Sequence, residues 1–263
     1  MKQMPKFGMI TNPTKEIISE INRAHKLGMD YVEIGIEPPK AAPKDIVKKK
    51  NRILKALKKF SHPPLIHTVY WCELGDSYEK IRESWIDEMK KEIIIASKLK
   101  AKIFGVHFNA KGVLHEETYL KMVSDNYIKS LRELVKFAKR YGIKITLENT
   151  PYPYSDFKNY RYLIDRVPGL YVHLDLGHVF ITDRMKGFNK FFSYFNKKIE
   201  HIHIHDNYGL TDDHLVLNDG KINFALVVKE LKKIKYNKTI TFEIHTSNKD
   251  LIKSVKIFKR LWS

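Results

Sequence analysis

Hydrophobic positions along the chain follow two alternating periodicities. Short runs rich in β-branched and aromatic residues are separated by longer stretches in which apolar residues recur every three or four positions. The first pattern predicts β-strands and the second predicts amphipathic helices. Eight strands are predicted, at residues 6–10, 31–36, 64–69, 101–108, 144–150, 170–176, 200–206 and 239–245.

The helical stretches are clearest at residues 14–28, 77–100 and 117–142, and another follows the last strand at 247–262. Gly28 and Gly142 stand where helix C-caps are expected. Strands that alternate with helices, without a linker, predict a single closed (β/α)₈ barrel over residues 1–263. A doubly wound open sheet is the alternative, but the glycine-rich phosphate turn of such sheets is missing after the first strand.

Composition indicates an ordinary globular protein, with 43% hydrophobic and 12% aromatic residues. No apolar run approaches the roughly 20 residues that span a bilayer, and the first residues lack the apolar centre of a signal peptide. We therefore expect a cytoplasmic protein without a membrane segment. Cys72 is the one cysteine, so an internal disulfide is excluded.

The charge balance is strongly basic, because 48 Lys and Arg face 30 Asp and Glu, for a net charge of +18. A surplus of this size attracts polyanions, including nucleic acids and phosphorylated small molecules. The lysines are spread over every predicted helix, however, as on the solvated faces of proteins from heat-loving organisms. Both explanations stay open, and the second is favoured.

Metal-ligand side chains stand where six consecutive predicted strands end. In a (β/α)₈ barrel the chemistry lies at this end of the strands and in the loops that follow. These side chains, including two from the loop after the seventh strand, are His67, His107, Glu148, Asp175, His178, His203, Asp212, His214 and Glu243.

Strand periodicity places these side chains on the inner face of the barrel. Ile202 and Ile204 share the face toward the helices, so His203 points inward, and the same alternation turns Asp175 and Glu243 inward. Unpaired buried charges would cost several kcal/mol each, and a divalent cation offsets that cost. Mixed His, Asp and Glu ligands favour Zn²⁺, Mn²⁺, Co²⁺ or Fe²⁺.

A lone histidine on a strand is more often a hydrogen-bonded core residue than a metal ligand. The histidines predicted as surface or packed polar residues are His25, His62, His115 and His173. His201 and His245 are predicted to support the ligands rather than to bind metal.

The motifs TLENT, HLDLGH, HIHIHDN, DDHLVLNDG and TFEIH resemble the xylose isomerase-like barrel superfamily, and the resemblance covers nearly the whole chain. The superfamily includes sugar and sugar-phosphate isomerases and epimerases and the endonuclease IV class of DNA-repair enzymes. In the epimerase branch one metal is held at positions that match Glu148, Asp175, His203 and Glu243. In the endonuclease IV branch a three-zinc cluster uses these four and five more, which match His67, His107, His178, Asp212 and His214.

The N-terminal part of the sequence differs from that of the endonuclease branch. It has FGMITNP in place of a GAHVS-like strand, and EIGIEPPKAAPKD in place of the DNA-intercalating loop. Tyr70 matches a nuclease tyrosine that enters damaged duplexes, but together with Trp71 it is equally suited to form the wall of a sugar pocket. The front end therefore favours the sugar-converting branch.

The favoured hypothesis is a metal-dependent isomerase or epimerase of a sugar or sugar phosphate. Glu148 and Glu243 are the predicted acid and base on either side of a metal that polarises the substrate carbonyl. His178 and His205 are expected to bind substrate hydroxyls, and Lys111 or Lys221 a phosphate.

The alternative is a zinc phosphodiesterase that cuts DNA at abasic sites, which the nine ligand types and the charge support. A third hypothesis, a barrel that has lost catalysis and serves as a scaffold, conflicts with the intact Glu148 and Glu243 pair. One bound ion per chain fits the isomerase and three fit the nuclease; the sequence leaves the oligomeric state open.

Overall fold

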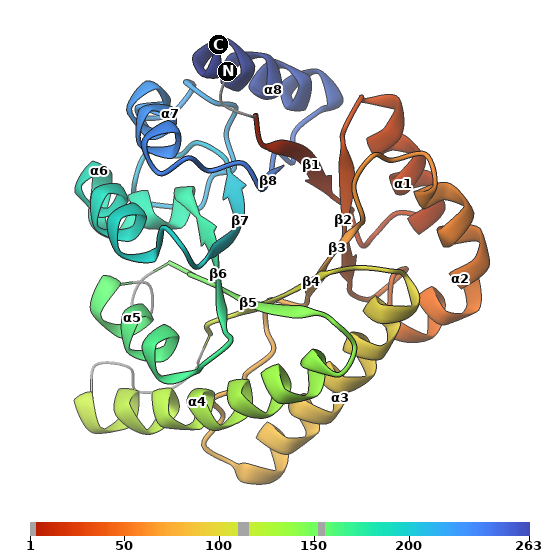
Figure 1. Ribbon diagram of the computed structural model, residues 1–263, viewed down its shortest axis with the longest axis vertical. Coiled ribbons are helices and arrows are strands. Elements are labelled where there is room, and N and C mark those ends of the chain that lie inside the picture. The colour runs from red at the N-terminus through yellow and green to blue at the C-terminus, as the bar shows by residue number, and fades with distance from the viewer. Residues whose placement is uncertain (1–3, 110–115, 152–155) are drawn as a thin grey trace.

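The computed structural model describes residues 4–109, 116–151 and 156–263. Eight parallel strands close into a barrel, each paired with the next and β8 with β1, inside a ring of helices (Figure 1). The strands are β1 (Lys6–Ile10), β2 (Tyr31–Ile36), β3 (Leu65–Thr68), β4 (Ile103–His107), β5 (Lys144–Glu148), β6 (Tyr171–Asp175), β7 (Ile199–Ile204) and β8 (Thr239–Phe242). The helices are α1 (Ile17–Lys26), α2 (Pro43–Leu57), α3 (Glu79–Lys98), α4 (Glu117–Lys139), α5 (Phe157–Arg166), α6 (Leu176–Phe195), α7 (Phe224–Lys233) and α8 (Asn248–Trp262). The predicted (β/α)₈ barrel is confirmed.

Helix α8 illustrates how the sequence pattern produces the outer ring. Its buried residues Leu251, Val255, Phe258 and Trp262 recur at intervals of three and four, so they form one apolar stripe. The Ser247 side chain accepts a hydrogen bond from the Asp250 amide and caps the first turn. The stripe therefore packs inward while the lysines of the helix face solvent.

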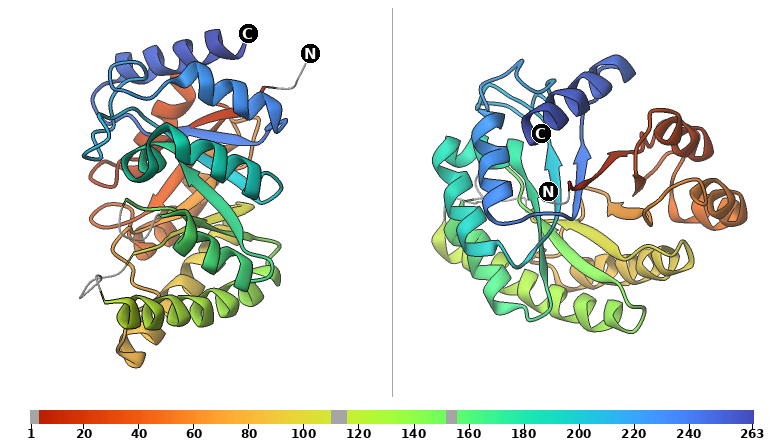
Figure 2. Two further views of the ribbon diagram at one scale, coloured as in Figure 1. Left: turned by 90° about the vertical axis from the view of Figure 1, so that its left-hand side faces the viewer. Right: turned by 45° about the horizontal axis from the view of Figure 1, so that its top comes forward.

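The two ends of the chain meet where the barrel closes, since α8 covers β1 and β8 (Figure 2). The ring of Phe7 in β1 contacts Phe242 of β8 and Phe258 of α8 edge to face, with centroids 5.5 and 5.6 Å apart. Such aromatic pairs add stabilisation beyond the apolar area they bury. This contact fastens the first strand to the last.

The aromatic segment of α6 belongs to the core. Phe188, Phe191, Phe192 and Phe195 are each at most 2% exposed, as expected for helical spacing that packs a helix on a barrel. Within the described residues no helix is long and apolar enough to cross a membrane. Cys72 is a buried free thiol.

No loop separates β6 from α6. Helix α6 begins at Leu176, directly after β6, and His178 lies in its first turn. Gly177 leaves room for a neighbouring ring, because a Cβ there would lie 2.0 Å from Cε1 of His205. The helix starts without a loop because Asp175 is its N-cap, accepting from the His178 amide at 2.7 Å.

Candidate metal centre

The nine predicted ligand side chains all gather at the C-terminal end of the barrel. Those from the strands are deeply buried, with Glu148 2% and Asp175 and His203 0% exposed. Asp212 and His214 reach the same place from the loop between β7 and α7 and stay partly exposed. The structure thus brings the nine together, and their role in binding metal remains a prediction.

Four of these residues form a central group around one ring nitrogen, Nδ1 of His203. It lies 3.1 Å from Oε2 of Glu243, 3.7 Å from Oε1 of Glu148 and 3.9 Å from Oδ2 of Asp175. Three carboxylates that converge on one nitrogen make a site of high negative charge. These are the four residues to which the family resemblance assigned a single metal.

A second group, the β3–β5 group, consists of His67, His107 and Glu148. The Nε2 atoms of the two histidines lie 2.9 Å apart, and Oε2 of Glu148 lies 3.3 Å from the first and 3.4 Å from the second. Glu148 therefore faces the central group with Oε1 and the β3–β5 group with Oε2. Glu148 would therefore contribute an oxygen to each of the two groups if both held cations.

A third group, the loop group, consists of His178, Asp212 and His214. Nε2 of each histidine lies 3.1 Å from Oδ2 of Asp212. The Nδ1 atoms face backbone carbonyl oxygens, that of Asn149 at 2.7 Å for His178 and that of Glu243 at 3.1 Å for His214. Since a carbonyl only accepts, both Nδ1 atoms carry hydrogen, and both Nε2 atoms are directed at the same carboxylate.

The loop that carries this group is held by one buried carboxylate, Asp206. Its Oδ2 accepts from the Gly220 amide at 3.0 Å and its Oδ1 from the Ile222 amide at 3.0 Å. The backbones of Asp206 and Leu215 also pair in both directions. A long loop is thereby fixed over the barrel rather than left in solvent.

The arrangement fits a divalent cation. Oε2 of Glu148, which faces the β3–β5 group, and Oδ2 of Asp175, which faces the central group, are buried without a hydrogen-bond donor among the described residues. A buried carboxylate oxygen without a donor is costly, and coordination of a cation would satisfy it. The donors are imidazole nitrogens and carboxylate oxygens, which suit Zn²⁺, Mn²⁺, Co²⁺ or Fe²⁺.

The charges of the metal-free groups point the same way. Burial opposes a charge on His178, but Asp175 and Asp212 raise its pKa to about 10, and Asp212 raises that of His214 to about 9. Burial raises the pKa of Glu148 to about 7, whereas His203 holds that of Glu243 well below its usual range in spite of burial. Without a cation, His178 and His214 therefore carry an additional proton at neutral pH.

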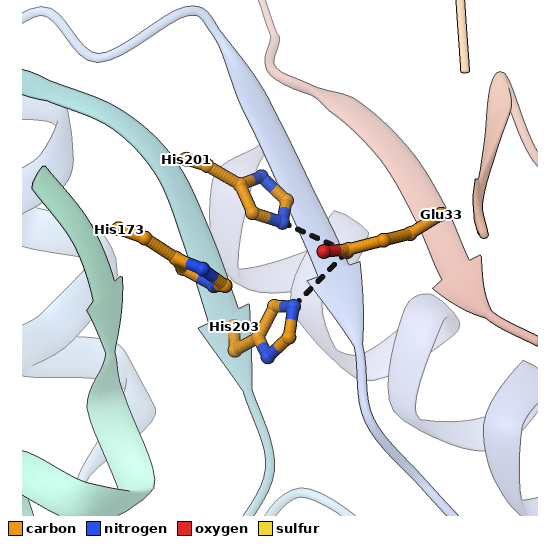
Figure 3. Close-up of side chains that lie close together, drawn as sticks. All are labelled: Glu33, His173, His201 and His203. Carbon is orange, nitrogen blue, oxygen red and sulfur yellow. Dashed lines mark hydrogen bonds and ion pairs between the residues drawn. The ribbon is translucent and has the colours of Figure 1, made fainter. Parts of the chain in front are cut away.

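Sequence reasoning missed Glu33, which lies on β2 and is 1% exposed (Figure 3). Its Oε2 accepts hydrogen bonds from Thr241 Oγ1 at 2.5 Å, His201 Nε2 at 2.9 Å and His203 Nε2 at 3.0 Å. Its Oε1 lies 3.2 Å from Nδ1 of His67. The signal was present, because a glutamate between the buried Val32 and Ile34 of YVEIGI points inward by the parity that located the ligands.

The histidines given supporting or packing roles lie in different surroundings. His173 is a fully buried packed residue whose ring centroid lies 4.0 Å from that of His203, and His201 is buried beside Glu33. His25 is exposed, and His62 is partly exposed. His245 lies at the rim, 3.7 Å from Glu243. His115 lies outside the described residues.

The predicted substrate contacts fall around this centre. His205 is fully buried, with Nε2 3.3 Å from both Asp175 and Asp212. Tyr70 and Trp71 are 64% and 37% exposed, and the Tyr70 ring centroid lies 6.5 Å from that of His107. Their contacts with a substrate stay predictions.

The two lysines expected near a phosphate cannot both be placed. Lys221 is exposed on the loop before α7, and Lys111 lies outside the described residues. A cavity of about 520 Å³ opens beside Glu243, between the ends of β1 and β8, and Lys15, Arg23 and His245 also line it. It offers room for a small substrate at the edge of the central group.

Comparison with known proteins places this geometry in context. The chain is 35% identical over 172 residues to an uncharacterized protein of Methanocaldococcus jannaschii, covering 65% of the chain and 66% of that relative. It is 25% identical to a probable endonuclease 4 of Aquifex aeolicus (97% of the chain, 96% of the relative) and to a fructoselysine 3-epimerase of Shigella flexneri (85% and 83%).

Among solved structures, a D-tagatose 3-epimerase-like protein superposes with a TM-score of 0.85 at 25% identity, covering 97% of this chain and 96% of the other. A model of the family described as the xylose isomerase-like TIM barrel matches residues 21–261. That match spans nearly the whole barrel, from α1 to α8, and includes every candidate ligand. The chain belongs to the xylose isomerase-like TIM barrel family.

Proposed function

We propose that this protein is a divalent-metal-dependent epimerase or isomerase of a sugar or sugar phosphate. The observation that carries the proposal is the pair of carboxylates, Glu148 and Glu243, that flank Nδ1 of His203. Similarity to the D-tagatose 3-epimerase-like structure and to fructoselysine 3-epimerase supports the same class of reaction.

The residues of the central group have different proposed roles in such a reaction. A cation held by Glu148, Asp175, His203 and Glu243 would polarise a substrate carbonyl and acidify the adjacent C–H. Glu243, whose pKa is held low, is ionised and suited to accept the proton from that carbon. Glu148, with a pKa near 7, is suited to return a proton at neutral pH.

The surroundings of the pair suit a small polar substrate. The cavity beside Glu243 is large enough for such a substrate. Tyr70 and Trp71, which follow β3 and do not line this cavity, are the proposed aromatic faces for a sugar ring. His178 and His205 are the proposed partners of substrate hydroxyls. The burial of Glu148 keeps bulk water away from the transferred proton.

Proton exchange provides the test. The protein loaded with Mn²⁺ or Co²⁺ is incubated in D₂O with a panel of ketoses and their phosphates, and deuterium at the carbon next to the carbonyl is followed by NMR. We expect incorporation with at least one substrate and none after chelation. A fully loaded protein that exchanges no proton in the panel would argue against the proposal.

A second candidate, a metal-dependent phosphodiesterase acting on abasic DNA, is favoured by the two further groups. The β3–β5 group and the loop group flank the central group, and several adjacent cations suit the displacement of an alkoxide from phosphate. The similarity to a probable endonuclease 4 and the charge of +18 agree with it. Metal-dependent nicking of a duplex with an abasic analogue tests it, and the absence of nicking with three ions bound would rule it out.

A further inference from the structure

Glu33 lies beside His201 and His203, on the strand β2 that supplies none of the candidate ligands (Figure 3). Three donors converge on its Oε2, and Nδ1 of His67, a buried atom without a hydrogen-bond partner, lies 3.2 Å from its Oε1. An oxygen on which three donors converge acts as an acceptor, so Glu33 receives these hydrogen bonds rather than donating one.

The direction of these hydrogen bonds decides which ring nitrogens are free. The ring nitrogen that hydrogen-bonds to the carboxylate must carry the hydrogen, so His203 is protonated on Nε2. For His67 the same carboxylate favours hydrogen on Nδ1, which lies 3.2 Å from Oε1 as an ion-pair contact. When the second proton of each ring is displaced, Nδ1 of His203 and Nε2 of His67 are the atoms left to offer a lone pair. Those are the atoms that face Glu243 in the central group and Glu148 in the β3–β5 group.

We propose that Glu33 is a positioning residue that fixes the tautomers of His67 and His203 together, so that one buried carboxylate sets the ligand atoms of two neighbouring cation sites. The inference rests on the metal-dependent function proposed above. Glu33 itself touches neither cation nor substrate. It acts through the two rings, as partners behind a metal's ligands commonly do.

The two oxygens of Glu33 differ in their contacts, since Oε2 accepts three hydrogen bonds and Oε1 faces only Nδ1 of His67. A single substitution can therefore distinguish them. In Glu33→Gln the amide has one accepting oxygen and one donating NH₂ group. The oxygen takes the place of Oε2, where three donors converge, and the NH₂ then faces Nδ1 of His67. His67 must accept there and carry its hydrogen on Nε2, the atom that the β3–β5 group needs as a ligand.

Titration of the full chain with Co²⁺, followed by visible absorption and by competition with a chelator, tests this consequence. We expect Glu33→Gln to weaken the ion of the β3–β5 group by about 10- to 100-fold and to change its absorption band. The ion of the central group stays bound. The matched control is Glu92→Gln, which alters another buried glutamate, on α3, and should titrate like the wild-type protein.

Ring-nitrogen NMR of the Zn²⁺-loaded wild-type protein tests the same point without a substitution, so a variant that fails to fold does not remove the test. We expect hydrogen on Nε2 of His203 and on Nδ1 of His67. The opposite tautomers, or a Glu33→Gln protein with unchanged Co²⁺ affinity and spectrum, would overturn the role of Glu33 alone. A wild-type protein that binds no metal would instead overturn the proposed function, and this inference with it.

Discussion

The side chain of Asp175 holds the backbone amide of His178 at 2.7 Å and thereby starts helix α6. The same side chain directs its other oxygen, Oδ2, toward Nδ1 of His203, 3.9 Å away. One aspartate thus ends a strand, caps a helix and faces the candidate cation site. Because the two tasks use different oxygens, substitution can separate them.

Asp175→Asn should keep the cap and lose the cation. Asparagine caps helices about as well as aspartate, so α6 is preserved, but its neutral side chain is a poor metal ligand. We expect at least tenfold weaker Co²⁺ binding with the helical circular dichroism unchanged. Asp156→Asn is the matched control, because Asp156 caps α5 in the same way and lies outside the three groups. Equal Co²⁺ affinity in the two variants would remove Asp175 from the ligands.

Glu148→Gln should abolish proton exchange while metal remains partly bound. The amide cannot take up or return a proton, whereas Asp175, His203 and Glu243 still surround the central position. We expect solvent deuterium incorporation into the substrate to fall below detection and metal content to fall only in part. NMR and elemental analysis of the same sample measure the two effects. Exchange at the wild-type rate would refute the role assigned to Glu148.

Glu92→Gln should stabilise the protein at alkaline pH. Glu92 is 3% exposed on α3, and burial raises its pKa to about 8 from the ordinary glutamate value of 4.5. Between these values the unfolded chain releases a proton that the folded chain keeps, so the free energy of unfolding falls as pH rises through this window. The substitution removes the loss, and urea denaturation should show a gain of up to about 4 kcal/mol at pH 8.5 and almost none at pH 4.

Glu88→Gln, one turn earlier on α3, is the control for this effect. The Glu88 side chain is 36% exposed, so its neutralisation should change stability little at either pH. A Glu92→Gln protein with the same advantage at pH 4 and pH 8.5 would show that packing, rather than ionisation, explains the gain.

Gly177→Ala should displace the ring of His205 and thereby disturb the candidate metal centre. The added Cβ would meet three atoms of the His205 ring at 2.0 to 2.7 Å, and a buried ring has little freedom to move. We expect a loss of about 1–3 kcal/mol in urea denaturation, together with weaker metal binding, because His205 contacts Asp175 and Asp212. Gly35→Ala is the control, since its Cβ would meet nothing closer than 3.9 Å. Equal free energies of unfolding for the two variants would show that the His205 ring moves aside without loss of stability.

The sequence by itself determined the barrel and the identity of the candidate ligands. Alternating strand and helix periods fix which segments form which element, and in a parallel barrel every strand ends at the same rim. The alternation of side chains along each strand therefore predicts, from the sequence alone, that Asp175, His203 and Glu243 point into the barrel. These inferences need only local periodicity and one rule of topology.

Only the tertiary structure decided how the ligands divide and what holds them. Glu33 meets His203 and Thr241 across intervals of 170 and 208 residues, and such contacts depend on the register with which β1 closes on β8. The place of His178 on a helix depends likewise on a cap that forms only when Asp175 ends its strand. A sequence states which side chains point inward; the closure of the barrel sets which of their atoms meet.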